Sequence, residues 1–284
     1  MFRLRNLDFT KEIVFDGINY VLNEKDLGKA DINLASFQGY NQMGIKITGR
    51  VINSRNVSIV GYILADDEVE MLNKKRNLQN MVSPFEDFFI VIDNYKIRVA
   101  ASSTIEYAVS YIENNKHLTK FLISGVCANP CFTELEAKTF PLAAWFGNFH
   151  FPFVMTADKP AVMGYKLPDR MRMIDNYGTT EIGMKIKIKA TTGNIQNPYI
   201  KNVITEEKLL LRCNMEEGET IEINTNYGEK SIVKNGEADY FYTLDLDSDF
   251  LQLHLGENYL AFGADTNEKH LEITIEYSPQ FLEV

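Results

Sequence analysis

KHLEITIEY, residues 269–277, alternates apolar and polar side chains with a period of two residues. Leu271, Ile273, Ile275 and Tyr277 would face a core, while the residues between them would face water. This alternation is typical of a β-strand with one buried face. The stretch therefore predicts a strand of an antiparallel sheet.

The same pattern recurs through the C-terminal region from residue 193 to residue 284. Residues 220–225 place Ile221 and Ile223 on one side, and Leu251, Leu253 and Leu255 alternate with polar residues. Glycine and asparagine separate the runs, and both tolerate the positive φ of tight turns. The turn signals are Glu217-Gly218, Asn226-Tyr227-Gly228, Asn235-Gly236 and Gly256-Glu257-Asn258. Short alternating strands joined in this way predict an antiparallel β-sandwich.

The first third of the chain also reads mainly as strands. Two hairpins are expected, one around Asp16-Gly17 and one around Asp93-Asn94, because such pairs fit two-residue turns. The expected strands cover residues 12–22, 44–52, 59–64, 88–92, 95–100 and 119–126. The N-terminal half is therefore predicted to be a β-sandwich or a barrel-like β-domain.

One helix is predicted in this half, over residues 67–82. Asp66 and Asp67 can cap its start, and Pro84 ends it, because the residue before a proline is pushed out of the α region. One apolar stripe is expected on the helix, formed by Met71, Leu72, Leu78, Met81 and Val82.

Composition limits the function classes. The chain has 284 residues, of which 45% are hydrophobic, so two domains with real cores are expected. A net charge of −10 argues against a general nucleic-acid or anionic-membrane surface. No run of about 18 apolar residues is present, so no membrane insertion is expected, and no apolar segment follows Met1 that would suggest a cleaved export signal.

The sequence contains no recognisable catalytic or metal-binding motif. The cysteines are odd in number and the histidines are scattered, so neither a disulfide framework nor a zinc site is expected. These residues are Cys127, Cys131, Cys213, His117, His150, His254 and His270. Asp245, Asp247 and Asp249 alternate with apolar residues, which fits a solvated strand face better than a calcium site. We therefore predict no enzyme and no catalytic, metal-binding or cofactor-binding residue.

Residues 133–175 carry an aromatic cluster whose place in the fold is open. It consists of Phe140, Trp145, Phe146, Phe149, Phe151 and Phe153. Such a cluster fits a connection between two domains that contributes side chains to both cores.

Several short motifs occur in an order that resembles the distal tail proteins of long-tailed, non-contractile phages. In the first half they are Arg76, Leu78, Pro84, YKIR (95–98) and KFLISGVCANPCF (120–132). In the middle they are WFGNFHFP (145–152) and NYG (176–178). In the last third they are NIQNPYIKN (194–202), EGETIEINT (217–225), Gly228, Lys230, LDSDFLQL (246–253), LGEN (255–258) and residues 277–284.

The resemblance implies a structural role. Residues 1–140 would form an N-terminal ring-forming β-domain, residues 141–155 a connection, and residues 156–284 a galectin-like β-sandwich. The N-terminal domains would assemble into a hexameric ring that passes DNA through its centre without sequence-specific binding. As a distal tail hub, the ring would join the major tail tube protein to a tail-tip or tail-associated lysin protein. The protein would lie at the tail tip of a phage or prophage particle, after assembly in the cytoplasm of the bacterial host.

Two other classes of function remain open. A sandwich of this kind can be a carbohydrate-binding module for attachment to the host surface. The only tryptophan, Trp145, precedes the predicted sandwich, which weakens that alternative because sugar sites usually stack an aromatic side chain on the ring. An enzyme is the third class, and fold alone supports neither alternative.

Overall fold

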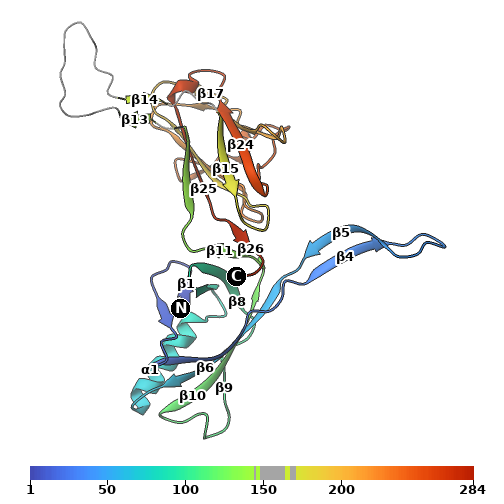
Figure 1. Ribbon diagram of the computed structural model, residues 1–284. Helices are drawn as coiled ribbons and strands as arrows, with labels where there is room; N and C mark the ends of the chain where they lie inside the picture. The colour runs from blue at the N-terminus through green and yellow to red at the C-terminus, as the bar shows by residue number, and fades with distance from the viewer. Residues whose placement is uncertain (144, 148–163, 167–170) are drawn as a thin grey trace. The chain divides into compact units, whose positions relative to one another are not determined.

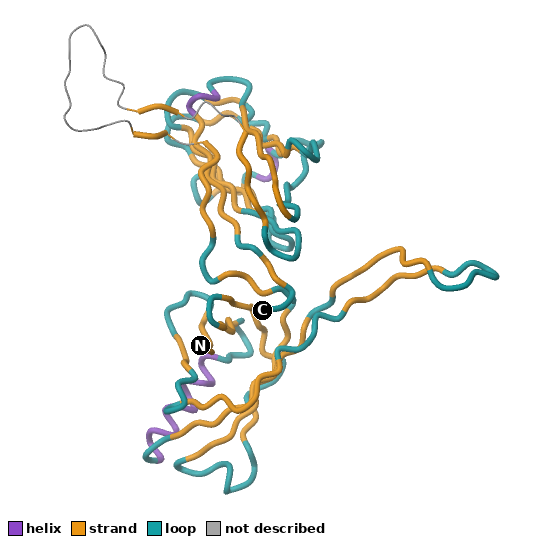
Figure 2. The backbone as a smooth tube through the Cα atoms, viewed as in Figure 1, coloured by secondary structure: helices purple, strands orange, loops and turns teal. Residues whose placement is uncertain are grey.

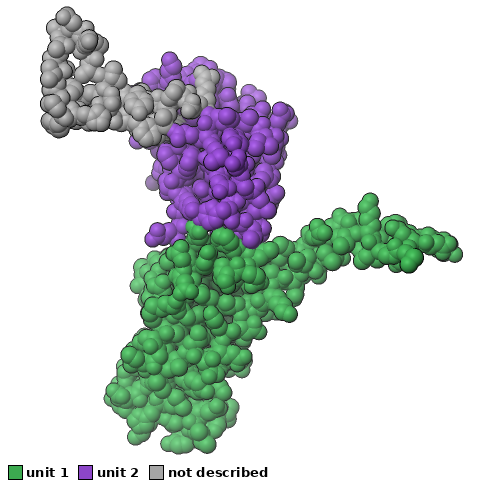
Figure 3. All heavy atoms as spheres, viewed as in Figure 1, with its two compact units in different colours: residues 1–135, 281–284 green, residues 136–280 purple. Residues whose placement is uncertain are grey.

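The computed structural model describes residues 1–143, 145–147, 164–166 and 171–284, which form two compact units. Unit 1 contains residues 1–135 and 281–284, and unit 2 contains residues 136–280 (Figure 3). The division falls before residue 141 because β12 (Lys138–Ala143) pairs with a strand of unit 2. Of the aromatic cluster, Phe149, Phe151 and Phe153 lie outside the described residues.

The chain is built mainly from antiparallel strands, as the sequence predicts, with one α-helix in the described part (Figures 1 and 2). The central path of the unit 1 sheet runs β2–β1–β7–β8–β10–β6–β3. Its strands are β1 (Phe2–Asn6), β2 (Glu12–Val14), β3 (Tyr20–Asp26), β6 (Arg55–Leu64), β7 (Phe88–Ile92), β8 (Tyr95–Ala101) and β10 (Leu118–Cys127). Two short strands pair with this path, β9 (Glu106–Tyr107) with β10 and β11 (Phe132–Glu134) with β8. A third, β26 (Gln280–Phe281), pairs with β11.

The predicted hairpin at Asp93-Asn94 is confirmed, and the one at Asp16-Gly17 is wrong. Asp93 has a φ of +50° and joins β7 to β8, which pair directly. Gly17 also turns the chain, with a φ of +80°. It connects β2 to β3, however, and these strands pair with β1 and β6 at opposite ends of the path. A turn signal therefore shows where the chain reverses but not whether its two strands pair.

Helix α1 (Glu68–Met81) matches the predicted helix to within one residue at each end. The Asp67 carboxylate accepts a hydrogen bond from the Glu70 amide at 2.7 Å, and the Glu70 side chain accepts one from the Asp66 amide. These reciprocal bonds satisfy amides that the first helical turn leaves open. Met71, Leu78 and Met81 are buried, as expected. Leu72 is 48% exposed, so its assignment to the buried stripe is wrong.

Strands β4 (Ile32–Phe37) and β5 (Lys46–Ile52) form a hairpin that continues from β3 and β6. Figure 1 shows it leaving the sheet of unit 1 as a two-stranded ribbon. We call residues 32–52 the arm. Every residue of the arm is exposed except Gly39 and Gly49, which are partly exposed. The sequence predicts β5 correctly, but its apolar residues do not enter a core.

Unit 2 is a sandwich of two main antiparallel sheets. The first runs β12–β25–β16–β21–β22–β23 and the second β15–β24–β18–β19. The strands of the first sheet after β12 are β16 (Lys185–Ala190), β21 (Thr220–Asn224), β22 (Ser231–Lys234), β23 (Ala238–Asp239) and β25 (Leu271–Tyr277). Those of the second are β15 (Met171–Asn176), β18 (Tyr199–Asn202), β19 (Lys208–Leu210) and β24 (Gly256–Gly263). Two small pairs are β17 (Ile195–Gln196) with β20 (Asn214–Met215), and β13 (Trp145–Gly147) with β14 (Gly164–Lys166).

The core of unit 2 lies between these sheets. Ile188 and Ile273 pair across β16 and β25, and both are fully buried, as are Ile200 and Leu260 on the other sheet. The predicted inward positions of β25 and β21 are confirmed.

The alternating leucines at 251, 253 and 255 do not form a strand. Leu251 and Leu253 are buried, but only Leu253 makes a β-bridge, with Ile182, and Leu255 is 56% exposed. Gly256, with a φ of +81°, turns the chain immediately after Leu255. The alternation of these three leucines therefore reflects the burial of two side chains and does not indicate a strand paired within a sheet.

The pairing of β12 sets the boundary of an independently folding fragment. A fragment of residues 136–280 is expected to unfold cooperatively, because it keeps β12 against β25 and the whole core. A fragment of residues 156–280 should melt at least about 5 °C lower, because it loses that strand and exposes one edge of β25. Circular dichroism melts of both fragments test this, and equal melting temperatures would contradict it.

Candidate assembly surfaces

The arm carries an apolar face without a partner in unit 1. In an antiparallel pair, residues opposite each other point to the same side of the ribbon. Three such pairs share one face: Ile32 with Ile52, Leu34 with Arg50, and Ser36 with Ile47. The four aliphatic side chains of this face are between 39% and 53% exposed. A two-stranded hairpin is marginally stable alone in water, so this face needs a covering surface.

A second exposed apolar surface lies at the N-terminal end of α1. Val69 is 68% exposed and Leu72 48%, and they lie three residues apart, so they share one side of the helix. Residues 109–112 add the exposed side chains of Val109, Tyr111 and Ile112. We call these five residues the helix patch.

Two contacts tie the loop of the helix patch to α1. The Lys75 ammonium donates a hydrogen bond to the Asn114 side chain at 3.0 Å. The Ala65 amide, just before the helix, donates to the carbonyl of His117 at 3.1 Å. The loop and the first turns of α1 are therefore held together. Acidic side chains surround this end of the helix, namely Asp66, Asp67, Glu68 and Glu70.

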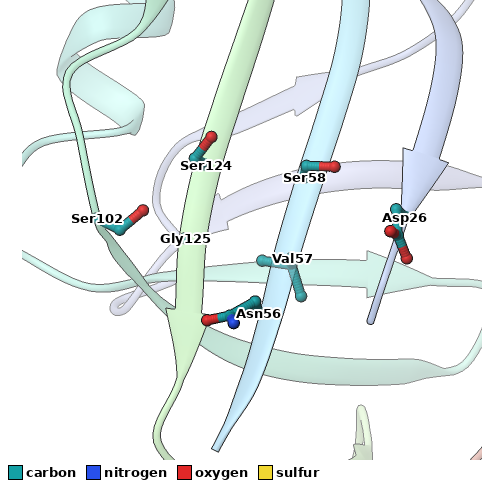
Figure 4. Close-up of a pocket in the computed structure, with 7 residues that line it drawn as sticks. All are labelled: Asp26, Asn56, Val57, Ser58, Ser102, Ser124 and Gly125. Carbon is teal, nitrogen blue, oxygen red and sulfur yellow. The ribbon is translucent and has the colours of Figure 1, made fainter. Parts of the chain in front are cut away.

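The described pocket of unit 1 is a polar hollow of about 300 Å³ on the sheet (Figure 4). Its lining residues come from β3, β6, β10 and the end of β8, and they are Asp26, Asn56, Val57, Ser58, Ser102, Ser124 and Gly125. Hydroxyl groups dominate, and the lining contains no histidine or cysteine. The lining also contains the carboxylate of Asp26 and the amide side chain of Asn56. The hollow is therefore a hydrophilic surface feature of the sheet.

Arg55 fixes the last residues of the chain to unit 1. Its side chain is fully buried, and its guanidinium carbon lies 4.9 Å from the centre of the Phe132 ring. Its Nη2 donates a hydrogen bond to the Leu282 carbonyl and lies 3.3 Å from the Glu283 carboxylate. Phe281 packs edge-on against Tyr95, with ring centres 5.4 Å apart. These contacts make residues 281–284 part of unit 1, whereas the sequence analysis assigned them to the C-terminal sandwich.

The predicted row of three aspartates is not a strand face. Asp245 lies at a turn, and its carboxylate accepts a hydrogen bond from Arg212, which lowers the pKa of Asp245. The Asp247 amide donates a hydrogen bond to the same carboxylate at 3.2 Å, so the Asp245 carboxylate accepts hydrogen bonds from Arg212 and from its own loop. Among the described residues, no three His, Cys, Asp or Glu side chains are grouped so as to hold a metal ion.

The cysteines and histidines of the described chain serve local packing. All three cysteines are buried, and burial raises the pKa of the Cys127 and Cys213 thiols to about 11. Thiols with raised pKa values are poor nucleophiles. His117 and His270 bond to neighbouring chain segments, while His150 lies outside the described residues.

His254 is the exception, because it joins two carboxylates. Its Nδ1 lies 2.9 Å from Glu181 and its Nε2 lies 3.6 Å from Glu207. The hydrogen bond with Glu181 raises the pKa of His254 above its ordinary value of 6.5, although partial burial opposes this. The three residues belong to separate segments of unit 2.

The raised pKa predicts a pH dependence of unit 2. A group with a raised folded-state pKa stabilises the fold below its unfolded pKa, and this contribution is lost as pH rises through the folded value. The side chain is 35% exposed, so solvent screens the pair and limits its effect to about 1 kcal/mol. We expect the melting temperature of wild type to fall by about 2–4 °C more than that of His254→Gln when pH rises from 6 to 8. Parallel curves for the two proteins would contradict this.

A second aromatic cluster, separate from the one between residues 140 and 153, lies in unit 2. Phe241 stacks on Phe250 with ring centres 5.6 Å apart, and the Lys230 ammonium lies 4.9 Å from the centre of the Phe250 ring. Tyr242 and Tyr227 are 79% and 72% exposed. Exposed aromatic rings beside a cation are suited to stacking with a planar or apolar face of a ligand.

In the described part of the chain, no helix is long and apolar enough to cross a membrane.

Comparison with known proteins gives consistent results for both units. Residues 177–281 match the profile of the siphovirus-type tail component, C-terminal domain. No curated protein matches the sequence significantly.

Solved structures extend the similarity to the whole chain. The Dit protein of phage SPP1, described as a paradigm of the hub adsorption apparatus in phages that infect Gram-positive bacteria, is 11% identical. It superposes with a TM-score of 0.67 over 99% of this chain and 100% of that chain. A chain of the activated phage P2 baseplate solved with Ca is 10% identical, with a TM-score of 0.54 and 97% coverage of each chain. The same baseplate solved with Sr gives a TM-score of 0.53 at 10% identity, again over 97% of each chain.

Residues 177–281 therefore resemble the siphovirus-type tail component, C-terminal domain, and the chain as a whole shares its fold with the Dit protein of phage SPP1. The predicted resemblance is confirmed at this level. The two comparisons are complementary, since the profile covers most of unit 2 and the fold match adds unit 1.

Proposed function

We propose that this protein is a distal tail hub of a long, non-contractile phage or prophage tail. The observation that carries the proposal is the fold match to SPP1 Dit over 99% of the chain, together with the tail-component profile on residues 177–281. The surfaces described above also suit a structural role, because the arm and the helix patch are apolar and exposed.

In this proposal unit 1 forms a hexameric ring, and the ring connects the major tail tube protein to a tail-tip or tail-associated lysin protein. Two features of unit 1 support assembly: a projecting ribbon with two open edges and an apolar face, and a second apolar surface on α1. The mature location would be the tail tip, reached after assembly in the bacterial cytoplasm. No turnover or metal requirement is part of this role.

Immunogold labelling tests the proposed location. An antibody against the purified chain should label the distal end of tails in particles that carry this protein. Light scattering of the purified protein at rising concentration, with and without tail tubes, tests self-association. Label on the capsid or the neck, or a failure to bind tails at all, would overturn the proposal.

A carbohydrate-binding module is the second candidate, favoured by the aromatic cluster of unit 2. Tyr227 presents an exposed ring whose centre lies 5.6 Å from the Lys230 ammonium, which is an arrangement that can stack on a sugar. NMR titration of the 136–280 fragment with host cell-wall oligosaccharides tests it. Saturable shifts abolished by Tyr227→Ala would support a glycan site, and unchanged spectra would exclude it for those sugars.

A further inference from the structure

A partly buried polar cluster joins α1 to the loop that follows β9. Lys75 comes from the helix, Tyr107 from β9, Asn114 from the loop and Thr119 from β10. Thr119 is fully buried, and the Tyr107 hydroxyl is buried without a hydrogen-bond partner in the described part of the chain. The cluster thus brings an amine, a carboxamide and two hydroxyl groups together from four segments of unit 1.

Lys75 is suited to act as a nucleophile. Its Nζ lies 5.1 Å from the centre of the Tyr107 ring, and burial lowers the pKa of Lys75 below its ordinary value. A lower pKa raises the fraction of neutral amine, which is the nucleophilic form. The adjacent Lys74 differs, because its ammonium pairs with the Glu70 carboxylate at 2.8 Å.

The Asn114 side chain presents the carbonyl that this amine can attack. Its Oδ1 accepts hydrogen bonds from Lys75 Nζ at 3.0 Å and from the Thr119 hydroxyl at 3.1 Å. Its Nδ2 donates to the Ala108 carbonyl at 2.9 Å, which fixes the plane of the amide. A donor on the carbonyl oxygen stabilises the negative charge that develops when a nucleophile adds, and holding both groups in contact makes the reaction intramolecular.

We propose that Lys75 and Asn114 react to form an isopeptide bond within the chain. The neutral Lys75 amine adds to Cγ of Asn114, and the Thr119 hydroxyl donates a hydrogen bond to the oxyanion. The bond between Cγ and Nδ2 then breaks, and Nδ2 takes the proton that the attacking nitrogen loses, so it leaves as ammonia. The product is a secondary amide, and the step requires no oxidant, reductant or further reactant.

The bond would make the contact between α1 and the loop permanent. It closes a covalent ring of roughly 40 residues, which restricts the unfolded chain as a disulfide of that loop length would. It also ties the helix to the loop that carries Val109, Tyr111 and Ile112 of the helix patch. Because the bond forms inside one chain, its test does not depend on the proposed hub function.

Mass spectrometry of the purified full-length chain tests the bond. After prolonged incubation at pH 8, wild type is expected to be lighter than its sequence mass by about 17 Da, the mass of the ammonia that leaves. Trypsin should then release one branched peptide in which residues 75–76 are joined to residues 99–116. Lys75→Arg keeps a charged donor for Asn114 but not a nucleophilic amine, so it should keep its full mass. The matched control, Lys74→Arg, should lose the same mass as wild type.

The thermal melt gives a second readout of the same bond. Lys75→Arg should melt at least about 5 °C below Lys74→Arg, because only the latter retains the closed loop. A wild-type mass that stays unchanged overturns the inference. It is also overturned if Lys75→Arg loses the same mass, or if the loss maps to Asn235-Gly236, where cyclisation also releases ammonia.

Discussion

Arg55→Ala is expected to lower the free energy of unfolding of unit 1 by about 3–5 kcal/mol, the range typical of losing a large buried side chain with its bonds. Three losses add in one direction. The variant leaves a cavity, removes the cation–π contact with Phe132, and removes the hydrogen bond that Arg55 donates to the Leu282 carbonyl. Urea unfolding followed by circular dichroism measures the change.

Two matched variants separate these contributions. Arg55→Met keeps most of the volume and also removes the guanidinium, whose Nε and Nη1 are buried without a hydrogen bond among the described residues. It should therefore cost less than half as much as the alanine variant, since an apolar side chain can replace a buried charge at little cost. Arg98→Ala, which breaks an exposed pair with Asp87, should cost under about 1 kcal/mol. Equal losses for Arg55→Ala and Arg98→Ala would show that the contacts of Arg55 do not stabilise unit 1.

Gly125→Val is expected to destabilise unit 1 by about 3 kcal/mol or more, at the upper end of overpacking effects. Gly125 lies where β8 meets β10, and only two residue pairs join these strands. A Cβ at this position would overlap the Val99 side chain and lie 3.0 Å from the Ala100 carbonyl oxygen. The clash would separate the two strands that connect both halves of the sheet path.

The arm offers a matched control for this variant. Gly49 lies within strand β5, and a Cβ added there would meet only Ala35 at 3.5 Å, which is ordinary contact. Gly49→Val is therefore expected to leave the midpoint of urea unfolding nearly unchanged. If both valine variants unfold at the wild-type midpoint, the close approach at Gly125 does not hold β8 and β10 together.

The sequence predicted elements with local signals well. α1 was found from its caps and its proline stop, and β25 from its alternation, because both signals act over a few residues. Leu72 was misplaced because a helical stripe read from sequence does not show which side is covered. The predicted pairing of the strands around Gly17 was wrong because β2 pairs with the preceding strand β1, while β3 pairs with β6, further along the chain.

The candidate surfaces were harder to predict than the strands. Ile45 and Ile47 alternate with polar residues as a core strand would, so the sequence could not distinguish an exposed arm from a buried strand. The burial of Arg55 was equally hidden, because its hydrogen-bond partner Leu282 lies more than 200 residues later in the chain. The motifs from residue 194 to residue 258, by contrast, indicated the family directly.

Unit 1 is completed by a segment that follows all of unit 2, and this has a consequence for the order of folding. The bond between Arg55 and Leu282 closes a loop of more than 200 residues, which is entropically costly while that loop is unfolded. Once unit 2 is folded, the loop is effectively shorter, because Lys138 pairs with Tyr277 near the two ends of unit 2. The two points where the chain passes from one unit to the other are then close together. Contacts between distant residues slow folding, so unit 2 should fold before residues 281–284 reach Arg55. Slow folding of the sandwich would then delay the maturation of the domain that we propose forms the ring.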